Sequence, residues 1–363
     1  MKRLFLLATI IVTSLFANSC AKHVYVGPNE ANKRYFDAWL QVNNIDVKPS
    51  GRGIYVLENT PGNGEAIKKD GFVFMDYTTY DLDGNILTYT TSEVAKQVGT
   101  YDYDSYSCFY GPQFLTTYEG NIYAGIADLL LDMKVGGSRK AIIPGWLFSY
   151  DSYATEKEYL EKTTSSDAKI YEVKIKDFTT DIDKWEIDSI GRFFNNDKVL
   201  IDGIAANKLF TTEHGWTMTA ADSVSKGFYY KQLKAPVDTT SFKADTTIYI
   251  NYTGRLLNGQ VFDTTIEDVA KDNNIWSSSR TYKPSQINWA GTEDNTYKGI
   301  TMGSDDTSVI SGFAMTLWQM RSMEKGIGIF YSPLGYSTSG SGKTIPAYSP
   351  LIFEIEIVEK PEE

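Results

Sequence analysis

Few side chains of this sequence could act as a nucleophile, a metal ligand or a proton carrier. The 363 residues include two histidines, His23 and His214, and two cysteines, Cys20 and Cys108. The histidines cannot supply a multi-His zinc site, and no Gly-x-Ser-x-Gly elbow accompanies them for a Ser-His-Asp triad. No Gly-x-Gly-x-x-Gly or Walker-type phosphate loop follows a strand-like run. We therefore expect no metal and no other cofactor.

The most informative stretch is a β-hairpin that ends in an aromatic ring followed by a carboxylate. It reads NYTGRLLNGQVFDTT, residues 251 to 265, and ends in Phe262-Asp263 before two threonines. Asn258-Gly259 stands between two strand-like runs, and this pair accepts φ > 0 at both central positions of a type I′ turn. An altered copy at residues 76 to 90, DYTTYDLDGNILTYT, has Asp83-Gly84 at the turn but lacks the Phe-Asp pair.

The hairpin belongs to a unit that occurs twice in the chain. Three further pairs of segments match in the same order: GIYVLENT (Gly53 to Thr60) with GFYYKQLK (Gly227 to Lys234), IYAGIADLLLDM (Ile122 to Met133) with VISGFAMTLWQM (Val309 to Met320), and KIYEVKIKDF (Lys169 to Phe178) with LIFEIEIVEK (Leu351 to Lys360). Four matched elements in one order indicate an internal duplication. Since 363 residues fit two domains of about 150 residues, each copy is expected to be one domain.

The elements that must position these residues are mostly strands. Aromatic residues make up 14% of the chain, and many short Thr/Tyr/Val/Ile runs are broken by Gly, Asn and Asp. In the second copy, Ile310, Phe313, Leu317 and Met320 recur at the spacing of one helix face. The final run alternates apolar and polar residues, as a strand with one buried face does.

Two amphipathic runs are predicted to be lead-in helices that pack on the domain following them. They cover Glu30 to Asn43 and Asp181 to Phe194, where Trp185, Ile187 and Ile190 lie near helical spacing. The interval 266–303 is long for a loop without structure of its own, so it is either an insertion that modifies access or specificity, or a decorative flap.

Residues 227 to 363 resemble the FKBP-type peptidyl-prolyl cis-trans isomerases. The counterparts of the family motifs are NYTG (Asn251 to Gly254), FD (Phe262-Asp263), VISGF (Val309 to Phe313), PLGYS (Pro333 to Ser337), TIPA (Thr344 to Ala347) and IFEIE (Ile352 to Glu356). The resemblance implies an α+β fold with two FKBP-like domains, each a curved antiparallel sheet wrapped around a short helix. The expected segments are a signal peptide (1–19), a lead-in helix with a degenerate FKBP-like domain (20–180), a helical linker (181–226) and an isomerase domain (227–363).

The resemblance also implies a site between helix and sheet. Its catalytic residues would be Tyr252, Phe262, Asp263, Ile310 and Tyr336, and its substrate-binding residues Val309, Phe313, Ile345 and Phe353. Asp263 would hydrogen-bond Tyr252, while the Ile310 N–H and the Tyr336 hydroxyl would each bind a substrate carbonyl. Taken singly, the phenylalanines would be assigned to ordinary core. Five positions depart from the family: Phe313 replaces the usual Trp, Gly335 and Ser337 flank Tyr336 where Ala and Gly are usual, Ala347 replaces a second Pro, and Met323 a turn Gly.

This set of residues suits rotation about the bond that precedes proline. Amide resonance gives that bond a barrier of ~18–20 kcal/mol and places negative charge on the carbonyl oxygen. The twisted transition state has lost most of that charge. A dry aromatic pocket therefore penalises the planar ground state more than the twisted state, and the reaction needs no nucleophile or metal.

The first copy keeps the fold signals but loses most of the pocket residues. Tyr77 is retained at the place of Tyr252, whereas Leu87-Thr88 replaces Phe262-Asp263. Tyr123 replaces Ile310 at the rim of the pocket, Ile126 replaces Phe313 at its floor, and Ser149 stands at the position of Tyr336. We expect the first domain to serve binding or spacing.

The first twenty residues are typical of a bacterial lipoprotein signal. Lys2 and Arg3 precede an apolar run of about 13 residues, too short to span a bilayer, and Ala17-Asn18-Ser19-Cys20 resembles a lipobox. We expect Cys20 to be lipidated and to anchor a cell-envelope protein in the outer membrane, facing the periplasm. Cys108, left without an intramolecular partner, is interpreted as a small buried hydrophobe.

The expected partners are proline-containing polypeptides. The formal charge of −11 argues against nucleic acid as a partner, because an acidic chain repels phosphates. The oligomeric state cannot be predicted. A non-catalytic protein-binding or chaperone-like lipoprotein with two FKBP-like recognition domains is the alternative, and a carbohydrate-binding protein that uses the tyrosines between Thr100 and Gly111 is a third hypothesis.

Overall fold

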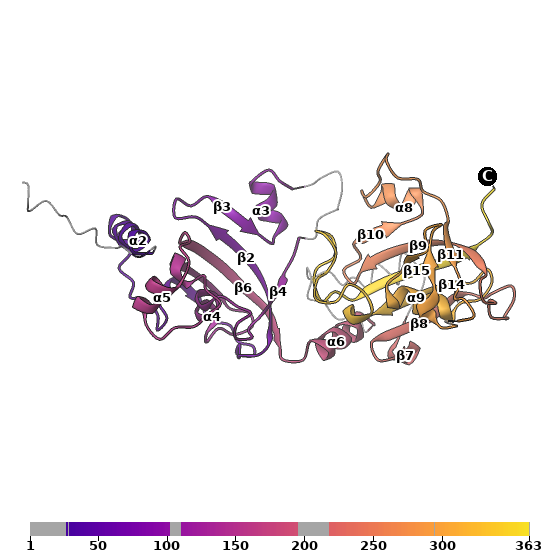
Figure 1. Cartoon of the computed structure of the whole chain (residues 1–363), viewed down its shortest axis with the longest axis horizontal. Coiled ribbons are helices and arrows are strands. Elements are labelled where there is room, and N and C mark those ends of the chain that lie inside the picture. The colour runs from indigo at the N-terminus through magenta and orange to yellow at the C-terminus, as the bar shows by residue number, and fades with distance from the viewer. Residues whose placement is uncertain (1–26, 28, 102–109, 195–217, 294, 363) are drawn as a thin grey trace, which may run out of the picture.

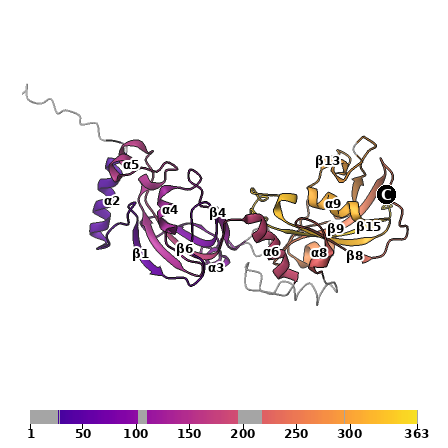
Figure 2. The same ribbon diagram turned by 90° about the horizontal axis from the view of Figure 1, so that it is seen from below.

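The computed structural model describes residues 27, 29–101, 110–194, 218–293 and 295–362. The predicted signal peptide, Cys20, His23, Cys108 and His214 lie outside these residues. Two antiparallel sheets lie side by side with helix α6 between them (Figures 1 and 2). No helix within the described ranges is long and apolar enough to cross a membrane.

The first sheet has the strand order β1-β5-β6-β2-β3, and β4 also pairs with β2. Its strands are β1 (Tyr55–Thr60), β2 (Phe72–Tyr80), β3 (Ile86–Tyr89), β4 (Gln113–Thr116), β5 (Ser138–Ile143) and β6 (Lys169–Thr179). The accompanying helices are α2 (Glu30–Val42), α3 (Ser92–Gln97), α4 (Ala124–Leu130), the 3-10 turn η1 (Gly145–Leu147) and α5 (Glu156–Lys162). Residues of α4 and Phe36 of α2 are buried in the core cluster of this domain.

The second sheet has the order β13-β12-β11-β9-β15-β14-β8-β7, and β10 also pairs with β9. Its strands are β7 (Ser223–Ser225), β8 (Phe228–Lys234), β9 (Thr247–Leu256), β10 (Val261–Thr264), β11 (Ser285–Asn288), β12 (Thr301–Met302), β13 (Thr307–Ser308), β14 (Lys325–Phe330) and β15 (Leu351–Val358). Among the described residues after 181, the helical segments are α6 (Ile182–Phe194), η2 (Ala220–Asp222), α8 (Glu267–Asp272), η3 (Tyr297–Gly299), α9 (Ser311–Gln319) and η4 (Ser332–Leu334).

The two sheets repeat one topology. The order β1-β5-β6-β2, with β3 and β4 both on β2, corresponds to β8-β14-β15-β9, with β10 and β11 both on β9. One hydrogen bond recurs at matching places, because the backbone N–H of Tyr77 donates to Thr90 Oγ1 at 3.1 Å and that of Tyr252 to Thr265 Oγ1 at 2.9 Å. The predicted α+β fold with two related sheets is therefore confirmed.

The predicted type I′ turns are wrong in both hairpins. Only the glycines have positive φ, 87° at Gly84 and 93° at Gly259, whereas Asp83 and Asn258 do not. The Gly259 N–H donates to the Leu256 carbonyl at 2.9 Å, so the loop turns before its left-handed glycine. This is the geometry of the longer hairpin loop that ends in a bulge. The Asn258 side chain accepts from the Gln260 N–H at 2.9 Å, which explains the preference for Asn at this position.

Helix α9 packs against the second sheet through the predicted face. Phe313 and Leu317 are buried, while Ile310 and Met320 are the residues that cap the two helix ends. The 266–303 interval has structure of its own, since it contains α8, β11, η3 and β12. The interval is therefore not a bare loop, and its α8 and β11 stand where α3 and β4 stand in the first domain.

Helix α6 contacts both domains, not only the one that follows it. Trp185 packs against Phe74 and Phe114 of the first sheet at centroid distances of 5.5 and 4.9 Å. Further along the helix, Phe193 belongs to a buried cluster with Ile352 of the second sheet. Ile352, whose side chain alternates with that of Phe353 along β15, is therefore buried together with residues of α6.

Candidate active site

All nine residues predicted for the site converge on one cavity of about 520 Å³ in the second domain. They come from β9 (Tyr252), β10 (Phe262, Asp263), the residues entering α9 and its first turn (Val309, Ile310, Phe313), the loop after η4 (Tyr336, Ile345) and β15 (Phe353). Five more residues line the same cavity: Met302, Ser308, Ser341, Gly342 and Thr344.

Aromatic rings in edge-to-face contact form the inner wall. Phe313 lies 5.1 Å from Phe353 and 5.5 Å from Tyr252 between ring centroids, at interplanar angles of 81° in both pairs. Phe262 lies 5.5 Å from Phe353. A Cβ added at Gly254 would lie 2.6 Å from the Phe262 ring, so the glycine of the Tyr-Thr-Gly segment makes room for this wall. The result is an apolar surface suited to a small saturated ring.

A hydrogen-bonded chain runs along one side of the cavity. The Tyr252 hydroxyl donates to Asp263 Oδ2 at 2.6 Å, and Arg280 Nη1 lies 2.5 Å from Asp263 Oδ1. Burial, followed by the charge of Asp263, raises the pKa of Tyr252 above its ordinary value, so Tyr252 stays a proton donor. Arg280 was missed by the sequence reasoning, because it lies in the insertion, where no motif points to the cavity.

Two groups at the cavity edge can bind carbonyl oxygens. Ile310 precedes α9 in an extended conformation (φ −62°, ψ 146°). Its backbone N–H has no hydrogen-bond acceptor among the described residues. Tyr336, which lines the same cavity, is half-buried, and burial followed by the charge of Asp263 raises its pKa, which keeps its hydroxyl protonated. Ser337 and Met323, which depart from family glycines, take the left-handed conformation with φ of 50° and 60°.

The matching positions of the first domain are built differently. Thr88, at the place of Asp263, shares a hydrogen bond of 2.6 Å with Thr79, and Leu87, at the place of Phe262, is 46% exposed. Ile126 is buried in the core, while the ring of Tyr123 packs on that of Tyr150 at 4.3 Å. The first domain therefore has neither a Tyr-carboxylate pair nor an aromatic floor at these positions.

Residues 288–358 match the family model of the FKBP-type peptidyl-prolyl cis-trans isomerases. The chain contains an FKBP-type peptidyl-prolyl cis-trans isomerase domain. The matched part of this FKBP-type domain contains six of the nine site residues: Val309, Ile310, Phe313, Tyr336, Ile345 and Phe353. The other three, Tyr252, Phe262 and Asp263, precede it. No curated protein matches the sequence.

Three solved structures illustrate what the chain is similar to. The three FKBP domains of wheat FKBP73 share 13% identity with it, over 84% of this chain and 92% of that one, at a TM-score of 0.26. A peptidyl-prolyl cis-trans isomerase from Pseudomonas syringae shares 22% identity over 43% and 92% (TM-score 0.25), and FkpA from Escherichia coli 20% over 42% and 59% (TM-score 0.27). Scores this low establish no shared arrangement of the whole chain.

Proposed function

We propose that the second domain catalyses cis-trans rotation about X-Pro bonds in exported polypeptides. The observation that carries this proposal is the Tyr252–Asp263 hydrogen bond at the edge of a cavity lined by Phe262, Phe313 and Phe353. The phenylalanines hold the proline ring away from water. Asp263 fixes the orientation of Tyr252, and Arg280 fixes that of Asp263.

Catalysis by this cavity is a matter of differential solvation. A planar X-Pro amide carries more negative charge on its carbonyl oxygen than the twisted amide does, so loss of water disfavours the planar form. The Ile310 N–H and the Tyr336 hydroxyl bind the carbonyls on either side and hold the chain in the turned shape. Uncatalysed rotation takes tens of seconds or more, and an acceleration of about 10⁴-fold needs about 5.5 kcal/mol.

The signal segment and the first domain bear on where and how this activity is used. We propose that Cys20 is lipidated and tethers the protein to the outer membrane on its periplasmic side, because the first twenty residues are typical of a lipoprotein signal. The first domain is proposed to be non-catalytic, since Thr88 and Leu87 stand where Asp263 and Phe262 stand in the second. Replacement of Cys20 by Ser should release the mature protein from the membrane fraction.

A protease-coupled assay on a proline-containing tetrapeptide tests the activity with the full mature chain. We expect Asp263→Ala to lower kcat/KM by about 10- to 100-fold, because the buried Tyr252 hydroxyl loses its charged acceptor. The matched change in the first domain, Thr88→Ala, should leave kcat/KM unchanged. A wild-type rate no higher than that of Asp263→Ala would instead favour a non-catalytic binding protein.

A further inference from the structure

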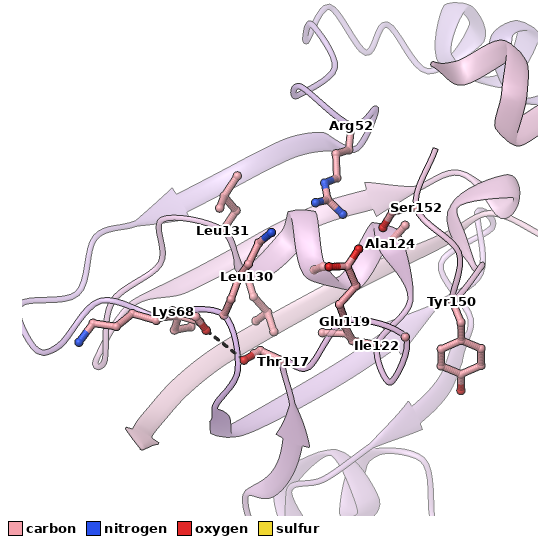
Figure 3. A pocket seen from close by; sticks show the side chains of 14 residues that line it. Arg52, Lys68, Thr117, Glu119, Ile122, Ala124, Leu130, Leu131, Tyr150 and Ser152 are labelled. Atoms are coloured by element: carbon pink, nitrogen blue, oxygen red, sulfur yellow. Dashed lines mark hydrogen bonds between the residues drawn. The ribbon is translucent and has the colours of Figure 1, made fainter. Parts of the chain in front are cut away.

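The first domain contains a cavity of about 100 Å³ beside helix α4 (Figure 3). Of the residues that match the isomerase cavity, Ile122, the counterpart of Val309, lines it, whereas Tyr77, Leu87, Ile126 and Tyr171 do not. Its apolar lining includes Ile67, Ile122, Ala127, Leu130 and Leu131. The cavity therefore lies beside the position of the isomerase cavity rather than within it, and its counterpart in the second domain can be found from strand register.

Strand pairing assigns the counterpart of Thr117, another lining residue. Thr116 of β4 pairs with the first residue of β2, and Asn288 of β11 pairs with the first residue of β9. The next residues are therefore equivalent. The backbone N–H groups of Thr117 and Trp289 confirm this, because both donate at 2.8 Å to the carbonyl of the residue before the neighbouring strand, Gly71 and Thr246 respectively.

In the second domain, aromatic rings fill the position that corresponds to Thr117. Trp289 stacks on Trp318 of α9 with a centroid distance of 5.4 Å and an interplanar angle of 10°, and Phe242 lies 4.9 Å from Trp289. The ungapped match of the two helices puts Leu131 at the place of Trp318. In the first domain Thr117 thus takes the place of Trp289.

The cavity is the space that these smaller side chains leave open. Leu131, which has no indole stacked on it, is 56% exposed. Apolar cavities of ~150 Å³ stay dry and bind a benzene ring, so about 100 Å³ at an open site suits one planar ring and not a lipid chain.

The charges around the opening favour a negative neighbour for that ring. Arg52, Lys68 and Lys69 line the site together with one lining acid, Glu119, in a chain whose formal charge is −11. Lys68 is paired with Glu65 at 2.7 Å, so Arg52 and Lys69 supply the excess of positive charge. Figure 3 shows the Arg52 guanidinium beside α4 with the Glu119 carboxylate below it, while the Lys68 side chain points away from both. Such a local excess of cations attracts acidic groups and repels basic ones.

We propose that this cavity binds one aromatic side chain of a polypeptide segment that also carries acidic residues, with the ring in the place that Trp289 fills in the second domain. A polypeptide is the expected source, because in the second domain the chain itself delivers the indole from the end of β11. The site would hold a partner polypeptide apart from the prolyl cavity.

Binding of the unlabelled peptide Gly-Trp-Glu-Asp-Gly to the full mature chain tests this proposal by isothermal titration calorimetry. We expect a Kd of about 0.1 mM, and at least about tenfold weaker binding of the same peptide with Ala in place of Trp, since the buried ring supplies most of the affinity. Arg52→Glu should weaken binding several-fold. The matched charge reversal Lys157→Glu, at a side chain that is 83% exposed on α5, should not.

The double variant Thr117→Trp, Leu131→Trp rebuilds the stacked pair of the second domain and should abolish binding while leaving isomerase kcat/KM unchanged. Leu131→Asp, a change at an exposed position, should also abolish binding. This variant provides the test if the double variant fails to fold. Equal binding of the Trp and Ala peptides, no binding of either, or undiminished binding by Leu131→Asp overturns the proposal. None of these outcomes depends on isomerase activity.

Discussion

The carboxylate of Glu186 in α6 accepts two hydrogen bonds from Ser332 of the second domain. Glu186 Oε2 lies 2.6 Å from the Ser332 backbone nitrogen, and Oε1 lies 2.7 Å from its hydroxyl. Glu186 is fully buried. Because Ser332 begins the turn that leads to Tyr336, the linker helix holds the base of the loop that carries this site residue.

The far end of the same loop is held by the first domain. The ring of Tyr348 lies between Phe72 and Phe114, at centroid distances of 5.3 and 5.4 Å. The Tyr348 N–H donates to the Ser337 carbonyl at 2.9 Å and so ties the two arms of the loop together. Residues outside the isomerase domain thus fix both ends of the loop that supplies Tyr336 and Ile345.

Removal of the Glu186 side chain should therefore weaken substrate binding as well as stability. Glu186→Ala leaves a buried N–H and hydroxyl of Ser332 without acceptors, which costs about 1–3 kcal/mol in the free energy of unfolding. The freed loop should raise KM more than it lowers kcat. Glu186→Gln can accept from the N–H and donate to the hydroxyl, so it should largely restore KM. An unchanged KM in Glu186→Ala would contradict the role of this contact in holding the loop.

Stability should also depend on pH through Glu186. Burial raises the pKa of Glu186 from an ordinary 4.5 to about 7, against the lowering effect of the two Ser332 hydrogen bonds and with a smaller raising effect from Asp183. Around it, Asp183 is paired with Lys226 at 2.6 Å, and the phenol of Tyr348 approaches from the loop.

The direction in which the free energy of unfolding changes with pH follows from proton binding. Between about pH 4.5 and 7 the folded protein holds the Glu186 proton more tightly than the unfolded chain does, so the free energy of unfolding falls as pH rises through this window. Over the whole window the free energy of unfolding should fall by about 3 kcal/mol. Urea unfolding at pH 5 and pH 8 measures it, and Glu186→Gln should lose this part of the pH dependence. Identical pH profiles for the two proteins would show that Glu186 does not titrate in this range.

Arg280 is expected to contribute modestly to activity. Its ion pair with Asp263 is partly exposed, with side-chain exposures of 39% and 33%, so its loss should cost about 1 kcal/mol or less and lower kcat/KM up to about fivefold. The effect should shrink at high salt, because salt screens the pair. Lys283→Ala, at an exposed position in the same insertion, is the control. Equal effects of the two changes would mean that the insertion, and not the Asp263 contact, matters.

The sequence predicts elements whose signal is local. Both hairpins, both lead-in helices and helix α9 are where periodicity and turn residues place them, and the nine site residues meet because strand order brings their motifs together. The type I′ prediction failed because Asn-Gly also suits a bulged loop, in which only the glycine is left-handed.

Contacts between distant segments could not be predicted. Periodicity placed Ile187 on the apolar face of α6, but Glu186 is the buried residue and Ile187 is partly exposed. Only Ser332, 146 residues away, explains a buried carboxylate there. In the same way, nothing in the sequence near Arg280 indicates Asp263, because the two residues meet only through the folding of the chain between β10 and β11.

The central claim is that the aromatic cavity of the second domain turns X-Pro bonds. The most direct measurement is the cis-trans exchange rate of a proline peptide, followed by NMR exchange spectroscopy with a catalytic amount of the full mature chain. We predict fast exchange with the wild type and with Leu87→Ala, and a loss of about tenfold or more with the matched Phe262→Ala. Exchange at the uncatalysed rate with the wild type, or equal rates for the two variants, would contradict the claim.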